Sequence, residues 1–183
     1  MSDTDIVTSV IIPAYNCAAT IAEAIDSVIA QQAEGVEIIV VDDGSTDSTP
    51  DVLRGFGNRI TAVRQDNAGA AMARNKAVSL SHGKYLAFLD ADDVWLPGRL
   101  ARTVELLERK PGAVMAFGDY ICVDHSRTRS ERVSAGRAPT HQDLLRHSWS
   151  ILPSAVTMRR TAFAAVGGFS EGFQGCGGED SFM

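Results

Sequence analysis

The sequence lacks any long hydrophobic run, and no apolar stretch approaches the roughly 20 residues that a membrane-spanning helix needs. Its N-terminus is polar and acidic, unlike a signal peptide, so we expect none. Any membrane contact would therefore be peripheral or made by a region outside this sequence. The cysteines Cys17, Cys122 and Cys176 show neither metal-ligand nor CxxC spacing. An odd number of cysteines without a secretory signal indicates free thiols in a reducing compartment, so the cytoplasm is the expected location.

An excess of positive charge is missing as well. The chain has 17 Lys and Arg against 23 Asp and Glu, a formal net charge of −6, which argues against nucleic acid as a partner. Its 183 residues, 45% of them hydrophobic, are enough for one soluble domain with a substantial core. No internal repeat or linker divides the chain, so we predict a single domain over residues 1–183.

Short apolar strands alternate with amphipathic helices through the first part of the chain. Pro13 is expected to stop the first strand because it has no N–H to donate, and Gly83 is expected to stop the third helix. Near-continuous apolar strands that alternate with helices predict an α/β fold whose mostly parallel sheet is covered on both faces. The expected strands are Val7–Ile12, Val36–Val41, Ile60–Arg64 and one ending at Asp90, and the expected helices begin at Ala18, at Thr49 (as N-cap), at Ala70 (ending near Ser81) and at Pro97.

The second half of the chain is less regular. Residues 113–123 predict one or two strands, residues 154–158 another strand, and residues 161–166 a short helix that Gly167 and Gly168 end. The polar stretch 125–139 carries four arginines. We interpret it as a solvated, mobile loop rather than a dedicated phosphate or lipid-headgroup patch.

Polar residues follow three of the expected strands, at Pro13–Asn16, Asp42–Ser45 and Asp90–Asp93. Ligands of α/β sheets bind beyond the carboxyl ends of the strands, so these loops should meet at one edge. Asp90, Asp92 and Asp93 place three carboxylates within four residues, and such a cluster resists burial unless a cation joins it. Hard ions such as Mg²⁺ or Mn²⁺ suit these oxygens. The alternative for this stretch is a simple acidic turn.

Five motifs along the chain together resemble the inverting family 2 glycosyltransferases of the GT-A fold. Any one of them is weak, but five in the right order are specific. They are Val10-Ile11-Ile12-Pro13-Ala14-Tyr15-Asn16, Val40-Val41-Asp42-Asp43-Gly44-Ser45-Thr46-Asp47, Ala73-Arg74-Asn75, Leu89-Asp90-Ala91-Asp92-Asp93, and Gly167-Gly168-Phe169 followed by Gly178-Glu179-Asp180.

The resemblance implies a nucleotide-sugar-binding half over about residues 7–125 and an acceptor-side half, incomplete here, over about residues 140–183. For the nucleoside, it implies that Pro13, Ala14 and Tyr15 flank the base, that Asp42 reads the base edge, and that Asp43 supports the turn or the nucleoside. For the diphosphate and metal, it implies that Arg74 faces the ribose or diphosphate and that Asp90-Ala91-Asp92 forms a DxD motif, in which Asp92 binds the metal and Asp90 contacts ribose or metal. For catalysis, it implies that Asp180 is the catalytic base, with Glu179 beside it.

The implied reaction is the transfer of a hexosyl or N-acetylhexosaminyl group from a nucleotide-diphospho-sugar, with a UDP-sugar favoured, to a hydroxyl acceptor. The acceptor would be a saccharide or lipid-linked saccharide in cell-surface polysaccharide or glycolipid synthesis. A divalent ion, Mn²⁺ or Mg²⁺, neutralises the leaving diphosphate, and a carboxylate takes the proton of the acceptor hydroxyl. The resemblance leaves open whether the protein contacts the inner face of the membrane peripherally and whether it forms an oligomer.

Each implied role has a structural alternative. Tyr15 could pack on the sheet, Asp42 could cap the turn that follows it, and Arg74 could be an ordinary exposed helix residue. Glu179 and Asp180 could be an acidic pair at a helix N-terminus, which does not exclude catalysis.

The chain departs from the family pattern at its C-terminus, where a helix normally follows Asp180. We therefore expect either a truncated form or a short form whose acceptor side is completed by a partner chain, and the absence of a Gln-x-x-Arg-Trp motif disfavours polymer synthesis. A nucleotide-sugar-binding module with little turnover is the main alternative function. Nucleotidyltransferases carry a glycine-rich loop after the first strand, where this chain has Pro13–Asn16, and receiver domains carry their paired acids after the first strand rather than the second, so both classes are disfavoured.

Overall fold

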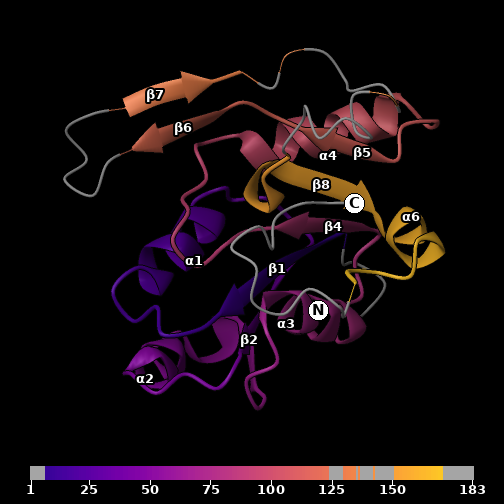
Figure 1. Cartoon of the computed structure of the whole chain (residues 1–183). Helices are drawn as coiled ribbons and strands as arrows, with labels where there is room; N and C mark the ends of the chain where they lie inside the picture. Colours follow the sequence, from indigo (N-terminus) through magenta and orange to yellow (C-terminus); the bar gives the residue numbers. More distant parts are fainter. Residues whose placement is uncertain (1–6, 124–129, 135, 137–141, 143–150, 171–183) are drawn as a thin grey trace.

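Figure 1 shows the computed structural model of the chain, which describes residues 7–123, 130–134, 136, 142 and 151–170. Strands and helices alternate along most of this length. Their order is β1 (Thr8–Ala14), α1 (Ile21–Ile29), β2 (Val36–Asp42), α2 (Thr49–Arg54), the 3₁₀ turn η2 (Gly57–Arg59), β3 (Thr61–Arg64), α3 (Ala70–Ser79), β4 (Tyr85–Phe88), α4 (Arg99–Arg109), β5 (Met115–Phe117), β6 (Tyr120–Val123), β7 (Ser130–Val133), the 3₁₀ turn η3 (Pro153–Ala155), β8 (Val156–Arg159) and α6 (Arg160–Ala165).

The main sheet has the strand order β3-β2-β1-β4-β8-β5. Strands β1 to β4 are parallel, with β2 and β4 pairing on either side of β1. Strand β8 is antiparallel to both β4 and β5. The sheet is therefore mostly parallel, and the predicted α/β fold class is confirmed.

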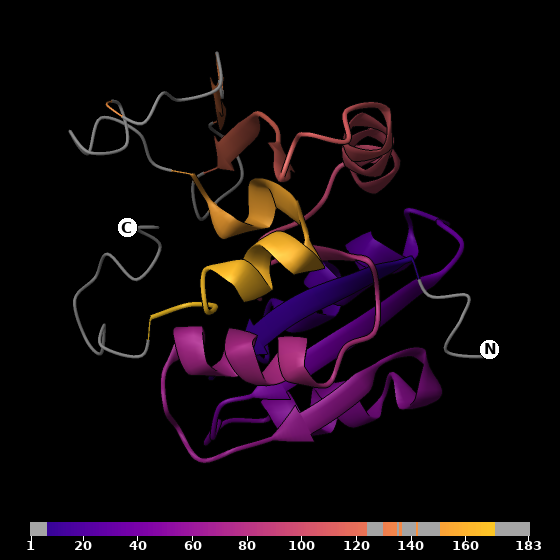
Figure 2. The ribbon, with the colours of Figure 1, turned by 90° about the vertical axis from the view of Figure 1, so that its right-hand side faces the viewer.

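Helices cover both faces of the sheet because its strands are apolar on both sides. Val10 and Ile12 of β1 belong to a core cluster that includes residues of α1, α2 and α4, whereas Ile11 belongs to a second cluster with α3 and α6. Figure 2 shows α3 and α6 side by side over that second face. Each fully buried aliphatic side chain stabilises the fold by about 1.5–3 kcal/mol, so these clusters hold the strand ends in place.

Pro13 does not stop the first strand, and that prediction was wrong. β1 continues to Ala14, with Pro13 paired to Val41. Ile11 O accepts from the β4 side and Ala14 O from the β2 side, so alternate residues of β1 face alternate neighbours. Pro13 therefore faces the β4 side, where the β1–β4 pairing ends at Ile11. No ladder hydrogen bond is lost there, so a proline is tolerated.

Gly83 does not stop the third helix either. α3 ends at Ser79, and the backbone of Gly83 is not in the left-handed region. A Cβ at this position would lie 2.6 Å from the Ser9 backbone nitrogen. The glycine is therefore required by the close approach of this connection to β1, and not by a helix cap.

The polar stretch 125–139 is not a loop throughout. Ser130–Val133 forms β7, which pairs antiparallel with β6 in a separate two-stranded sheet. The exposed Arg132 of β7 contacts Asp119. Cross-strand pairing to Tyr120–Val123 thus orders part of a segment whose composition alone suggests solvated loop.

Some element ends also differ from the prediction by a few residues. α1 begins at Ile21 rather than near Ala18, because Thr20 and Ile21 first form a turn onto the Cys17 carbonyl. Ser48, not Thr49, is the N-cap of α2. β8 begins at Val156, after η3.

Candidate functional site

The loop after β2 contains Asp42, which is 3% exposed. Its Oδ1 accepts from the Ser45 N–H at 2.9 Å, and its Oδ2 accepts from Arg64 Nη1 at 2.6 Å. The turn-capping contact considered as the alternative role is therefore present. A carboxylate has about four lone-pair sites, so these two bonds leave Asp42 capacity for a further donor.

Asp43 organises the connection that leads into α3. It is buried and accepts from Gln65 Nε2 at 2.7 Å, from the Ala68 N–H at 2.9 Å and from the Gly69 N–H at 2.8 Å. Gly44, with φ at +78°, allows a close fit, since a Cβ there would lie 2.9 Å from the Asn67 nitrogen. Asp43 therefore supports the loop structure, one of the two roles expected for it.

The loop after β1 is tied to the loop after β2 through Asn16, the last residue of the first motif, for which the resemblance implies no role of its own. Asn16 Oδ1 accepts from the Thr46 N–H at 2.7 Å, and the Asn16 N–H donates to Ser45 Oγ at 2.9 Å. The backbone of Asn16 is left-handed, with φ at 47°, a conformation that asparagine tolerates well. Next to it, Tyr15 is 51% exposed. Its ring is thus largely free of the sheet, as a base-stacking role requires.

Residues 90–93 form a turn at the end of β4, in which the Asp93 N–H donates to the Asp90 carbonyl at 3.1 Å. The Asp90 N–H donates to Ser154 Oγ at 3.0 Å. Trp95 Nε1 in turn donates to the Ser154 carbonyl at 2.9 Å. Ser154 therefore fixes the turn from the far end of the chain, although nothing in its sequence context marks it.

Arg99 supports the same segment from α4. It donates to the carbonyl oxygens of Ser154 and Val156 at 3.1 and 2.8 Å, and its guanidinium lies 4.2 Å from the Trp95 ring centroid. Burial lowers the pKa of Arg99 to about 9, which is still above neutral, so the group stays charged at pH 7.

Arg74 of α3 is 2% exposed, which excludes the ordinary exposed helix residue considered in the sequence analysis. Its Nη2 lies 2.6 Å from Asp90 Oδ1 in an ion pair. The structure thus joins two predicted site residues from different elements. Because Asp90 keeps a side-chain exposure of 22%, the pair reaches the surface on the carboxylate side.

The predicted convergence of the three loops is observed. Ala14 pairs with Asp42 at the end of β1 and β2, and the Leu89 N–H donates to the Ile11 carbonyl at the end of β4. The loops after β2 and β4 therefore flank the loop after β1 on one edge. Pro13 and Ala14 are buried in β1, Ala91 is half-buried and Asp92 is exposed. Glu179 and Asp180 lie outside the described residues.

Cys17 lies in the loop after β1, where its N–H donates to Thr49 Oγ1 at 2.9 Å. Burial raises the pKa of the Cys17 thiol, which therefore stays protonated at neutral pH and is a poor nucleophile.

A metal ion fits the donor set of the turn after β4. Within the described residues no group of three or more His, Cys, Asp and Glu side chains could hold a metal. Mg²⁺ and Mn²⁺ bound to nucleotides need fewer, since one or two carboxylates combine with phosphate oxygens and water. The exposed Asp92 with the part-exposed Asp90 meets that requirement.

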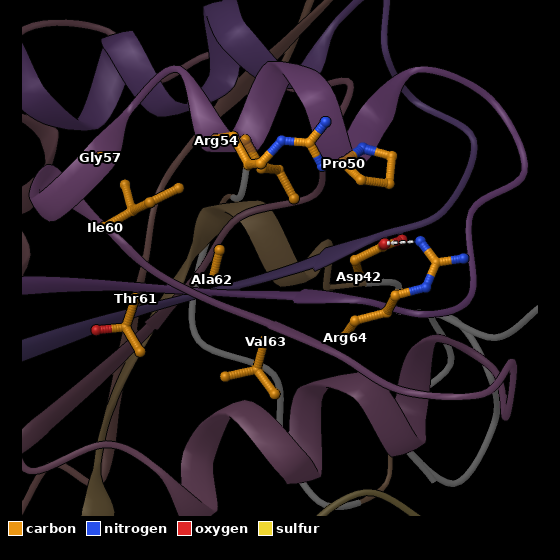
Figure 3. Close-up of a pocket in the computed structure, with 10 residues that line it drawn as sticks. Asp42, Pro50, Arg54, Gly57, Ile60, Thr61, Ala62, Val63 and Arg64 are labelled. Atoms are coloured by element: carbon orange, nitrogen blue, oxygen red, sulfur yellow. Dashed lines mark hydrogen bonds and ion pairs between the residues drawn. The ribbon is translucent and has the colours of Figure 1, made fainter.

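A surface groove of about 690 Å³ lies between α2 and β3 (Figure 3). Asp42 and Arg64 line one end of it, and their ion pair is drawn there. Of the predicted site residues that the structure describes, Asp42 alone lines this groove. We therefore assign the candidate site to the edge formed by the three loops, where the other predicted residues lie.

The sequence of the chain is similar to those of known proteins. The profile of glycosyl transferase family 2 matches residues 9–167. TuaG of Bacillus subtilis (strain 168), a glycosyltransferase whose name places it in teichuronic acid biosynthesis, is 35% identical over 144 residues, 76% of this chain and 57% of its own length. WfaP of Escherichia coli, a UDP-Glc:alpha-D-GlcNAc-diphosphoundecaprenol beta-1,3-glucosyltransferase, is 39% identical over 102 residues, 55% of this chain and 41% of its own.

A solved structure has the same fold. The mannosyltransferase PcManGT from Pyrobaculum calidifontis, in complex with GDP-Man and Mn²⁺, superposes with a TM-score of 0.70 and 26% identity over 95% of this chain and 49% of its own. The GT-A fold expected from the sequence is thereby confirmed. The present chain spans about half the length of the relatives it matches. No helix among the described residues is long and apolar enough to cross a bilayer.

Proposed function

The chain belongs to glycosyl transferase family 2, and we propose that it transfers a sugar from a UDP-sugar to a hydroxyl acceptor, with inversion and with Mn²⁺ or Mg²⁺. The acceptor is a saccharide or lipid-linked saccharide of cell-surface polysaccharide or glycolipid synthesis, and the group moved is a hexosyl or N-acetylhexosaminyl group. TuaG and WfaP support this class of reaction by their names, and WfaP supports UDP as the nucleotide. The cytoplasmic location stays a prediction.

One observation carries the proposal: the loops after β1, β2 and β4 meet at one edge of the sheet with different degrees of exposure. Tyr15 offers an exposed ring beside the buried Asp42, which fits a base held between a π-face and a hydrogen-bond acceptor. Arg74 and Asp90 lie on the other side of β1, which fits the ribose and diphosphate. A nucleotide diphosphate laid along this edge would meet these groups in that order.

The metal ion would be held by Asp92 with Asp90, and when bound it supplies positive charge to the leaving diphosphate. The protein's own groups position the donor. Arg74 orients Asp90 through its ion pair. Ser154 holds the turn by accepting from the Asp90 backbone.

Sugar transfer itself forms one bond and breaks another. The acceptor oxygen bonds to the anomeric carbon as the bond from that carbon to the diphosphate oxygen breaks, and attack from the opposite face inverts the centre. We assign the acceptor proton to the Asp180 carboxylate, with Glu179 beside it. This assignment rests on the Gly178-Glu179-Asp180 motif.

A thermal-shift and calorimetry panel of UDP-, GDP- and TDP-sugars, with Mn²⁺ and with EDTA, tests the proposal. At 100 times Kd a ligand stabilises the folded state by about 2.7 kcal/mol, which raises Tm by roughly 5–10 °C for a chain of this size. We expect this shift with one UDP-sugar and only with metal. Equal UDP affinity in Mn²⁺ and in EDTA would contradict metal dependence, and a shift with GDP-sugars alone would contradict the choice of nucleotide.

The second candidate function is a nucleotide-sugar-binding module without turnover. It needs only the donor-side edge of the sheet, where Tyr15, Asp42 and the Arg74–Asp90 pair lie. Measuring UDP release with and without saccharide acceptors separates the two. Asp180→Asn should keep donor binding and abolish release if the chain is a transferase. Binding without release, identical in wild type and Asp180→Asn, would establish the binding module instead.

A further inference from the structure

Asn75, in the middle of α3, makes a two-way contact with a backbone segment far along the chain. Its Nδ2 donates to the Phe169 carbonyl at 2.9 Å, and the Phe169 N–H donates to its Oδ1 at 3.0 Å. One side-chain amide thus satisfies both backbone groups of a residue that follows α6. A short amide with both a donor and an acceptor suits this geometry, and aliphatic side chains cannot replace it.

Gly168 leaves the room that this contact needs. A Cβ at Gly168 would lie 2.8 Å from Asn75 Oδ1, and the backbone there is left-handed, with φ at +85°. Both facts require glycine. The contact between Asn75 and Phe169 is therefore built into the chain at two positions that are far apart in sequence.

The Phe169 ring lies between the strand that leads to Asp90 and the arginine that pairs with Asp90. It packs on Phe88 of β4 with a centroid distance of 5.3 Å and an interplanar angle of 88°. The Arg74 guanidinium carbon lies 5.4 Å from the same ring centroid. Arg74 in turn holds Asp90 at 2.6 Å. The Arg74 guanidinium thus contacts both the Phe169 ring and the Asp90 carboxylate.

We propose that Asn75 is a positioning residue for the nucleotide-sugar donor. It anchors the Phe169 backbone, the Phe169 ring sets the position of Arg74, and Arg74 aims Asp90 at the diphosphate and its cation. The inference rests on the proposed function, because it takes Arg74 and Asp90 to be on the donor side of the site. It also makes donor affinity depend on the segment that leads, along the chain, toward Glu179 and Asp180.

The test compares Asn75→Ala with the wild-type chain by calorimetry of UDP binding in Mg²⁺. Groups that orient a metal or phosphate ligand typically account for roughly 10- to 100-fold in affinity, so we expect Kd to rise by about 10-fold or more. Lys76→Ala, at the next and exposed position of α3, is the matched control and should bind UDP as the wild type does.

A stabilising role alone is separated from a positioning role by combining Asn75→Ala with Arg74→Lys. If Asn75 acts through Arg74, the double variant binds UDP no more weakly than Arg74→Lys alone, because residues that act as a unit are not additive. Losses that multiply would overturn the inference. UDP affinity in Asn75→Ala equal to that of the wild type would also overturn it, and would leave the proposed function intact.

A second measurement uses only the wild-type chain and so does not depend on how a variant folds. In a titration with Mg²⁺ and UDP followed by NMR, we expect the Asn75 side-chain amide resonance to shift and the Phe169 N–H to exchange more slowly. Binding of UDP with neither change would overturn the inference. A wild-type chain that binds no nucleotide with metal would overturn the proposed function, and this inference with it.

Discussion

Two acidic loops lie at the carboxyl edge of the sheet, one after β2 and one after β4, and they hold their carboxylates differently. Asp42 and Asp43 are each 3% exposed and accept hydrogen bonds from Ser45 and from the segment 64–69. Asp92 is exposed, and the described residues give it no hydrogen bond or ion pair. The first loop is therefore a scaffold that holds neighbouring loops together, and the second keeps a carboxylate available for a ligand.

The topology explains the difference. Strand β3 pairs parallel with β2, and its register places Arg64 opposite Asp42, so the residues that follow β3 arrive beside the first loop with donors. On the side away from β1, β4 pairs with the antiparallel strand β8, so the N-terminal end of β8 lies beside the second loop. There Ser154 accepts from the Asp90 backbone and so does not satisfy a carboxylate.

The largest expected effect is on the scaffold loop. Asp43→Ala removes the acceptor of two backbone N–H groups and of Gln65, and it leaves those part-buried donors unpaired. We expect the free energy of unfolding to fall by about 3 kcal/mol, measured by urea denaturation.

The open loop provides the matched control for that prediction. Asp92→Ala, at an exposed carboxylate, should change the free energy of unfolding by less than about 0.5 kcal/mol. Similar losses in the two variants would show that the loops do not differ in the way described here.

The next expected effect is on ligand binding, for which the loop after β4 should be the more sensitive of the two. Asp92→Asn should weaken UDP binding in Mn²⁺ by at least about 10-fold, equivalent to 1.4 kcal/mol, because it removes the carboxylate assigned to the metal. Binding in EDTA should be the same in the variant and the wild type. Calorimetry with both buffers measures the difference.

Asp51→Asn, an exposed change of the same kind on α2, controls for the loss of one negative charge. It should leave UDP affinity in Mn²⁺ unchanged. Unaltered binding in Asp92→Asn would remove Asp92 from the metal site and leave Asp90 as the remaining assigned ligand.

Much of the fold could be predicted from the sequence, because the local patterns and the packing agree there. The buried strands Val36–Asp42 and Tyr85–Phe88 are apolar runs bounded by turn residues, and they form where the pattern indicates. Pro13 and Gly83 were misjudged for one reason. Both were interpreted by their local backbone preference, whereas their roles depend on which neighbour lies beside them. That information is non-local.

The site shows the same limit. The positions of Asp42, Asp90 and Asp92 at the sheet edge follow from the parallel arrangement of the strands, which the alternating pattern predicts. The burial of Arg74 against Asp90 could not be predicted from the sequence of α3, because small and polar residues are spread along the whole helix. The contacts of Asn16, Asn75 and Ser154 could not be predicted, because their partners are 29 to 94 residues away in the sequence.

Glu37, at the opposite end of the sheet, extends the comparison to a third carboxylate that accepts hydrogen bonds from protein donors. It accepts from the Ser9 hydroxyl at 2.6 Å and from the backbone N–H groups of His82 and Gly83 at 2.5 and 3.2 Å. Burial alone would raise the pKa of Glu37, but the hydrogen bonds outweigh it and hold the pKa below its usual value of 4.5. The ionised form is therefore the one that stabilises the fold.

The expected effect of Glu37→Gln is the smallest of the three and depends on pH. A depressed pKa gives stability that is present above about pH 4.5 and lost as the pH falls through the folded-state pKa. The variant should lose about 1 kcal/mol at pH 7, and the gap to the wild type should close on acidification. His82 and Arg160 face this carboxylate and are unchanged in the variant. Urea denaturation from pH 7 to pH 3 measures the gap, with Glu34→Gln at an exposed position as the control. A gap that stays constant over this range would mean that the charge of Glu37 does not stabilise the connection before β4. Hydrogen bonds from protein donors would then not be enough to make the charge of a carboxylate stabilise this fold.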